Sequence, residues 1–255
     1  MNLFVLKLIL APVIIGSASL AGRKWGPAVS GWIIGLPLTS GPVVFFLALS
    51  HDAAFASSAA LGVISGGISL VTYALAYVWI AKRFRWQAAI VGSLLAFLAC
   101  TAILQNLSFP LFPIFFFVLG AIVLALRLIP NERVEPTDAQ PGPWDIPARI
   151  LIGTSFILTL TGVAPLIGPR LTGLLTTIPL YASILTVFAH RHQGAAAAAH
   201  VLRGLLYGLF AFAGFFLTLN LMLERAGIAA AFLSAIAIAL AIQGTSLWVL
   251  RQMHR

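Results

Sequence analysis

Uninterrupted apolar runs of the length that a bilayer requires recur along the whole chain. We predict membrane spans at about 3–22, 27–49, 54–81, 86–106, 110–129, 148–166, 169–189, 195–223 and 227–250. A transmembrane helix needs about 20 apolar residues, whereas barrel strands alternate apolar and polar residues over about ten. Only 8% of the residues are charged, against about 25% in a typical soluble domain. The chain is therefore predicted to be an all-α polytopic membrane protein with about nine transmembrane helices.

Positive charge lies mostly at alternate ends of these spans. The 15 Lys and Arg residues leave a formal net charge of +9, which in a soluble protein would indicate nucleic acid. Here most of them fall in connections on one side of the predicted bundle, including 23–24, 82–85, 127–133 and the C-terminus. Lys and Arg in short loops favour the cytoplasmic side. We therefore expect no nucleic-acid partner and a multi-pass protein of the bacterial inner (plasma) membrane, with its N-terminus periplasmic and its C-terminus cytoplasmic.

The two halves of the chain match without a gap at an offset of 142 residues. The pattern GP-x-x-[ST]-G-x(5)-P at 26–37 recurs at 168–179 (168 − 26 = 142), and Gly62-x-x-x-Gly66 recurs as Gly204-x-x-x-Gly208. An odd number of predicted spans separates the two starts, so the second copy should be upside down relative to the first. The alternative is a chance likeness between two apolar, glycine-rich stretches.

The predicted organisation is thus two inverted-topology repeats of four helices plus one linking helix. We assign 1–107 to the first transmembrane repeat, 108–147 to the linking helix and a cytoplasmic loop, and 148–255 to the second, inverted repeat. The Phe-rich linking helix is interpreted as facing lipid, and a homodimer through the same face is left open.

Two predicted spans contain a proline deep inside the apolar run, at equivalent places in the two halves. Pro37 and Pro179 each remove a helical hydrogen bond and crowd the preceding turn. In lipid the freed carbonyl needs a new partner, and hydroxyl-bearing side chains stand nearby: Thr39, Ser40, Thr176, Thr177 and Tyr181. One interpretation is a pair of merely kinked helices. Because the break recurs in both copies, we favour interrupted helices whose free amides and hydroxyls bind a solute near the bilayer midplane.

Other polar side chains within the spans are few. Arg203 lies inside its span, where it either snorkels to the interface or faces inward, toward carbonyls or an anionic substrate. Asn220 is the deep amide that we add to the candidate site. Outside the long linker the only acids are Asp52 and Glu224, both at predicted membrane edges. This distribution disfavours coupling through an intramembrane carboxylate.

We predict no cofactor, no metal site and no enzymatic activity. His190, His192 and His200 lack the spacing of a good helical ligand pair and have no cysteine or carboxylate near them in the sequence. The chain also contains no nucleotide-binding loop and no arrangement typical of a catalytic triad.

The duplicated GP-x-x-[ST]-G-x(5)-P pattern resembles that of a group of uncharacterised small bacterial inner-membrane proteins. The architecture is also similar to inverted-repeat secondary transporters of about ten helices, of the drug/metabolite or bile-acid carrier type. This likeness implies a transporter fold, and fold alone does not determine function. Because the chain lacks the intramembrane acids of the sodium-coupled type, the resemblance assigns no binding residues.

Together these features predict a secondary transporter or exporter of a small neutral, amphipathic or anionic solute, surrounded by lipid. The candidate substrate-binding residues are Pro37, Thr39, Ser40, Thr176, Thr177, Pro179, Tyr181, Arg203 and Asn220. The alternative is a lipid-handling, flippase-like protein or a membrane scaffold subunit without transport activity. A polar pocket between the two breaks would favour the carrier, a lateral groove would favour lipid handling, and a dry bundle would favour the scaffold.

Overall fold

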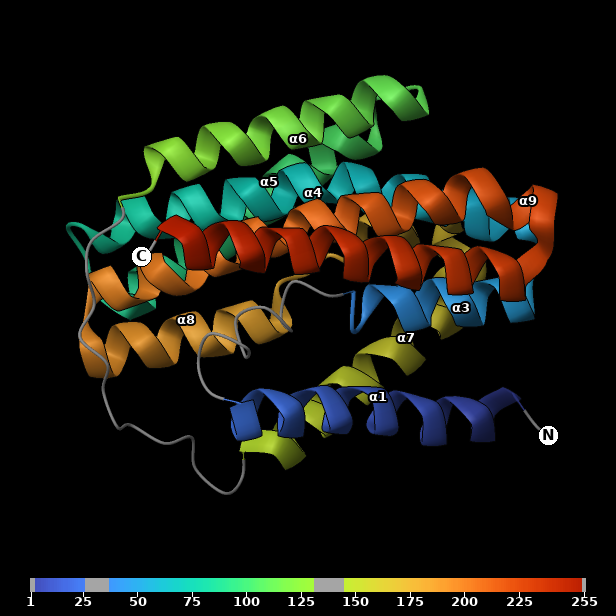
Figure 1. The fold of residues 1–255 in the computed structure, drawn as a ribbon, viewed down its shortest axis with the longest axis horizontal. Helices are drawn as coiled ribbons and strands as arrows, with labels where there is room; N and C mark the ends of the chain where they lie inside the picture. Colours follow the sequence, from blue (N-terminus) through green and yellow to red (C-terminus); the bar gives the residue numbers. More distant parts are fainter. Residues whose placement is uncertain (1–2, 26–36, 131–144, 254–255) are drawn as a thin grey trace.

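The computed structural model describes residues 3–25, 37–130 and 145–253, and all regular structure in these ranges is helical. Figure 1 shows a bundle of elongated helices, most of which run roughly along its length. The helices are α1 (Leu3–Trp25), α3 (Ser40–Ser50), α4 (Ala53–Ala81), α5 (Trp86–Gln105), α6 (Leu111–Leu128), α7 (Asp145–Leu175), α8 (Leu180–Gln193) and α9 (Ala195–Met253). The predicted linker at 131–144 and most of the first GP pattern, at 26–36, lie outside the described residues.

The composition and exposure of the helices match a membrane environment. Five helices of the described residues are long and apolar enough to cross a bilayer. Large apolar side chains such as Leu95 of α5 and Phe116 and Phe117 of α6 are more than half exposed, as expected where lipid replaces water. The prediction of an all-helical, membrane-embedded protein is confirmed at this level.

Two glycines with positive φ interrupt the longest helices. Gly168 in α7 has φ 80° and Gly227 in α9 has φ 79°, a region that side chains other than glycine rarely adopt. In Figure 1 the orange and red limbs of α9 lie side by side and run in opposite directions, and Gly214 of the first limb packs against Ile238 and Ile242 of the second. The chain therefore turns back on itself at Gly227.

The predicted count of nine separate spans is not supported by these elements. Predicted boundaries at 166–169 and 223–227 fall inside α7 and α9, whose backbone stays helical up to the glycine and resumes directly after it. The sequence indicated connecting loops there because Gly-Pro and Glu-Arg interrupt the apolar runs. In each helix the backbone changes direction at a single glycine instead. The inverted repeat is not established by this architecture and stays a prediction.

Helix α4 lies at the centre of the bundle and organises the core. It packs against α5, α7 and α9, and its Tyr73 and Tyr77 are among the largest fully buried side chains. The helix begins at an Asp52 cap, whose carboxylate accepts a hydrogen bond from the Phe55 amide at 2.7 Å. Such a cap satisfies one of the first amides of the helix. Gly66, in the middle of α4, lies against Thr177 beside the second predicted break.

Candidate functional site

The described backbone at Pro37 and at Pro179 lies outside a helix. Helix α7 ends at Leu175 and α8 begins at Leu180, with Pro179 as its N-cap. The amides of Thr177 and Ile178 bond three residues back, at 3.2 and 3.1 Å, in the tight turns that commonly end a helix. On the other side α3 begins at Ser40, directly after the turn that follows Pro37.

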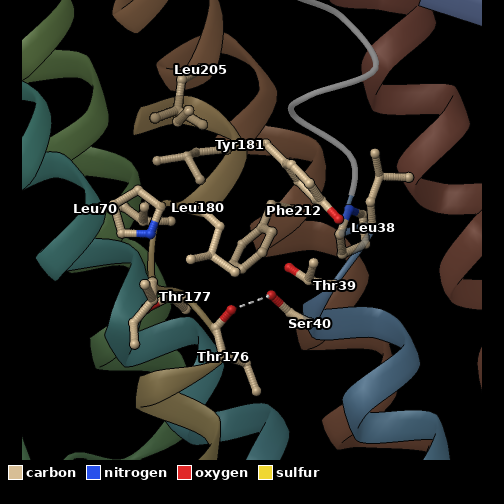
Figure 2. A pocket seen from close by; sticks show the side chains of 15 residues that line it. Leu38, Thr39, Ser40, Leu70, Thr176, Thr177, Leu180, Tyr181, Leu205 and Phe212 are labelled. Carbon is tan, nitrogen blue, oxygen red and sulfur yellow. Dashed lines mark hydrogen bonds between the residues drawn. The ribbon is translucent and has the colours of Figure 1, made fainter. Parts of the chain in front are cut away.

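The two breaks meet in space although they lie far apart in the sequence. The Ser40 hydroxyl donates a hydrogen bond to the Thr176 carbonyl oxygen at 3.0 Å, and this bond is visible in Figure 2. Thr176 precedes Pro179 in the last irregular turn, so its carbonyl belongs to the interrupted segment. A hydroxyl from one break thereby satisfies backbone that the other break leaves outside a helix.

A pocket lies between the two breaks. Its empty volume is about 510 Å³, which includes the space at its open side. We call it the break pocket. It is lined by residues 37–40 at the start of α3, residues 176–182 around the second break, Leu70 of α4, and Leu205, Leu209 and Phe212 of α9.

Seven of the nine predicted site residues line the break pocket, and no lining side chain is charged: the seven are Pro37, Thr39, Ser40, Thr176, Thr177, Pro179 and Tyr181. Figure 2 shows Thr39 and Ser40 on one side of the pocket, Thr176 and Thr177 at its lower edge, and the side chains of Leu38, Leu70 and Leu205 among them. A mostly apolar lining with a few polar groups is typical of small-molecule sites. The lining is therefore suited to a small amphipathic solute.

Most hydroxyls of the pocket already donate to the protein. Thr176 donates to the Gly173 carbonyl at 2.7 Å and Thr177 to the Leu174 carbonyl at 2.6 Å, whereas the side chain of Thr39 makes no capping bond to α3. The Tyr181 hydroxyl donates to the Arg149 carbonyl at 3.2 Å. A hydroxyl that donates keeps lone pairs for accepting, so Thr176 and Thr177 present acceptors. Thr39 donates to no residue that the structure describes and so also keeps its donor.

Backbone amides add donors at the same place. The first amides of a helix have no partner within the helix, and α8 starts at the pocket wall. Within the described part of the chain, the amides of Tyr181 and Ala182 have no hydrogen-bond acceptor. Because the N-terminal ends of α3 and α8 both border the pocket, the partial positive charge of each helix end is directed toward it. This potential favours neutral or anionic solutes over cations.

Two glycines of α4 allow the segment at the second break to pack closely against this helix. A side chain on Gly62 would collide with the Arg170 carbonyl, and one on Gly66 would collide with the Thr177 side chain. Small residues at this spacing allow helix backbones to approach. The sequence motif predicts the close packing, and the structure identifies its partners as the second limb of α7 and the turn that follows it, which carries the pocket threonines.

Two predicted site residues lie elsewhere. Arg203 donates to the carbonyls of Leu126 and Ile129 at 2.7 and 2.6 Å, so it caps the end of α6. The Asn220 amide donates to the Ser57 carbonyl at 2.8 Å and ties α9 to α4. Neither side chain lines the break pocket. Both are deep polar groups that bond helix carbonyls. From the sequence alone, such groups cannot be distinguished from groups that bind a solute.

The apolar wall was not predicted. Leu70, Leu205, Leu209 and Phe212 have the periodicity of any buried helix face, and no local signal marks them as pocket residues. Comparison of the chain with family models, curated proteins and solved structures found no match. The chemistry of the site must therefore be interpreted from its own residues.

Proposed function

We propose that the chain is a small secondary transporter or exporter whose solute binds in the break pocket. The observation that carries this proposal is the convergence of the Pro37 and Pro179 segments on one mainly apolar pocket that also contains side-chain hydroxyls. Interrupted helices leave backbone donors and acceptors available within a membrane, and many carriers place their substrate at such interruptions. Uncharged hydroxyls, free amides and an apolar wall fit a small neutral, amphipathic or anionic solute.

We further propose nine membrane crossings in two halves of opposite orientation. Matching helices start 142 residues apart: α1 at Leu3 and α7 at Asp145 (145 − 3 = 142), and α4 at Ala53 and α9 at Ala195 (195 − 53 = 142). In the second half, the first limb of α7 is one crossing, its second limb together with α8 is another, and the two limbs of α9 are two more, which makes four. The first half has four in α1, the predicted span 27–49 that contains α3, α4 and α5, and α6 lies between the halves. This assignment keeps the proposed repeats at 1–107 and 148–255.

Contacts between matching elements support the opposite orientation. Lys7 of α1 donates to the Thr161 hydroxyl at 2.9 Å, while Ile15, farther along α1, lies beside Gly153. Residue numbers thus rise along α1 as they fall along α7, as in an antiparallel pair. Tyr73 of α4 and Ser183 of α8 are joined by a hydrogen bond. At the positions offset by 142 residues from these two, the Phe215 ring of α9 lies beside Gly41 of α3.

The basic end of the bundle is assigned to the cytoplasm of a bacterial-type cell. The loop that follows α4 carries Lys82, Arg83 and Arg85, and α8 ends with Arg191 near the Trp86 ring at 6.0 Å. Positive loop residues favour this side. The opposite end, where Asp52 caps α4, then faces the periplasm. In this orientation the two halves open the break pocket alternately by moving against each other.

Solute flux across proteoliposomes tests the proposal. Vesicles are loaded with a defined mixture of small neutral and monoanionic organic solutes, and each solute is followed by mass spectrometry. We expect the wild type to release at least one solute faster than protein-free vesicles and a Pro37→Ala/Pro179→Ala double variant to lose this activity. Pro12→Ala is the matched control, because Pro12 lies inside α1 and outside the pocket.

Three other outcomes of this experiment would argue against a solute carrier. Unchanged flux in the double proline variant would remove the break pocket from the pathway. Movement of fluorescent lipid between leaflets without solute flux would instead favour a lipid-handling protein. A wild type that moves neither solute nor lipid would favour a scaffold.

A further inference from the structure

Hydrogen-bonding side chains follow one face of α8 from the break pocket to the basic end of the bundle. Ser183, Thr186 and His190 are spaced by three and four residues, which places them on one face of the helix. Two tyrosines of α4 meet this face, one turn apart. We call these five residues the α8 file: Tyr73, Tyr77, Ser183, Thr186 and His190.

The contacts within the α8 file are specific. The Tyr73 hydroxyl lies 3.0 Å from the Ser183 hydroxyl, and the Tyr77 hydroxyl lies 3.2 Å from Nδ1 of His190. The rings of Tyr77 and His190 also meet edge to face, with centroids 5.8 Å apart. Both tyrosines are fully buried, whereas His190 is half-buried in the last turn of α8. His190 therefore bonds the buried Tyr77 hydroxyl while its own ring lies at the basic end of the bundle.

Thr186 supplies an unused polar group inside the file. Its side chain is fully buried, and its hydroxyl has no hydrogen-bond partner among the residues described. Thr161 and Thr218, by contrast, donate to the carbonyl four residues earlier, the usual arrangement for a threonine inside a helix. A buried hydroxyl without a partner carries a free-energy penalty, so its position between Ser183 and His190 favours a function over packing.

Among the residues that the structure describes, the groups that face His190 contain no acid. From α4 it meets Tyr77, with Tyr73 one turn away, and its own helix carries Arg191 and His192. Packed against α8 are α5, with Arg85 at its N-cap, and α9, with an exposed His200 and an Arg203 engaged by α6 carbonyls. Of these side chains, His190 is the imidazole that is bonded to a buried partner, and an imidazole can gain a charge on mild acidification.

We propose that His190 is the proton-binding site of this carrier and that the α8 file couples its protonation to the break pocket. This inference rests on the proposed transport function and names the coupling ion. In the neutral state the Tyr77 hydroxyl donates to Nδ1. A proton taken from the cytoplasmic water binds Nδ1, which then no longer accepts from the Tyr77 hydroxyl, so the hydrogen bond of the neutral state is lost.

Protonation thereby changes the bond that holds the basic end of α8 to α4. The helix is short, and His190 lies about 15 Å along its axis from the pocket residue Leu180. A rigid helix of this length transmits a movement at its end to Leu180, Tyr181 and Ala182 in the pocket wall. Loosening α8 from α4 opens the pocket toward the cytoplasm, so protonation and access are coupled.

Thiol labelling of a pocket residue measures this coupling without a known substrate. Thr39→Cys is placed in a Cys100→Ser background, and its rate with a membrane-impermeant maleimide is measured from the cytoplasmic face between pH 8 and pH 5. Phe84→Cys, at an exposed position of the basic loop after α4 and outside the pocket, corrects for thiol ionisation. We expect the corrected rate to rise about fivefold or more on acidification, the lower range of usual coupling.

Three variants show which residue causes the pH dependence of the labelling rate. His190→Gln should abolish the pH dependence, and Tyr77→Phe should raise the rate at pH 8 toward the acid value because the tethering hydroxyl is gone. His200→Gln, at an exposed histidine of α9, should leave the profile unchanged. A Thr39→Cys thiol that reacts with the same pH profile in His190→Gln would overturn the coupling but not the carrier. No reaction from either face at any pH would overturn both.

Discussion

The two copies of the glycine motif occupy different surroundings. On α4, Gly62 lies against the Arg170 carbonyl and Gly66 against Thr177, so that helix is pressed onto the segment leading to the second break. On α9, Gly204 has no described atom within 4 Å of the position of a side chain. Its neighbour Arg203 instead bonds the carbonyls that end α6.

This difference shows that a repeated sequence does not enforce repeated packing. The α4 glycines bring two backbones together, which holds Thr176 and Thr177 in the pocket wall. The α9 region is held by a charged side chain that satisfies helix-end carbonyls. One wall of the break pocket is therefore fixed by shape and its counterpart by hydrogen bonds, and substitutions should separate the two.

Gly62→Ala should have the largest effect on stability. The added methyl group collides with a backbone carbonyl that cannot move alone, so we expect a loss of about 3 kcal/mol in the free energy of unfolding. Gly204→Ala, the matched substitution on α9, should change it by less than about 0.5 kcal/mol. Equilibrium unfolding in detergent measures both values, and equal losses would contradict the comparison.

Arg203→Met should destabilise the α9 side by about 2 kcal/mol. The substitution removes two charge-assisted hydrogen bonds and leaves the Leu126 and Ile129 carbonyls without these donors in an apolar setting. Arg225→Met is the control, because Arg225 is exposed and a surface charge contributes little. If the two variants unfold alike, the charged anchor is not what holds α9 to α6.

Tyr181→Phe should cost about 1 kcal/mol, the value of one neutral hydrogen bond. It removes only the hydroxyl that bonds the Arg149 carbonyl, and the ring stays against Gly153. Tyr207→Phe, on α9 outside the pocket, serves as the matched change. Thermal unfolding of the detergent-solubilised protein should rank Tyr181→Phe below Tyr207→Phe, and the reverse order would remove this bond from the account.

Thr39→Val should have the smallest effect on stability and a clear effect on transport. The side chain makes no capping bond to α3, so we expect a change of less than about 0.5 kcal/mol in unfolding. Loss of the one pocket hydroxyl that keeps its donor should slow solute flux. Normal flux with normal stability would show that Thr39 does not contact the solute.

The sequence indicated the pocket but not its whole boundary. Pro37 and Pro179 mark the breaks because an internal proline has a local backbone consequence, and the threonines beside them follow from the same reasoning. Leu205 and Phe212 carry no such signal, since pocket wall and core share one periodicity. Arg203 and Asn220 were included because deep polar groups are rare, yet the carbonyls that they bond cannot be identified without the fold. The turn at Gly227 was expected as a loop, because a positive φ cannot be read from composition.

If the break pocket lies on a route across the membrane, a thiol placed in it should be reachable from either side. Sealed vesicles containing the Thr39→Cys variant in the Cys100→Ser background are treated with an impermeant maleimide from outside, or from inside after encapsulation. We expect reaction from both faces, because the two halves expose the same residue alternately. Reaction from a single face under every condition would contradict this expectation, since the pocket would then be a surface cavity and not part of a transport path.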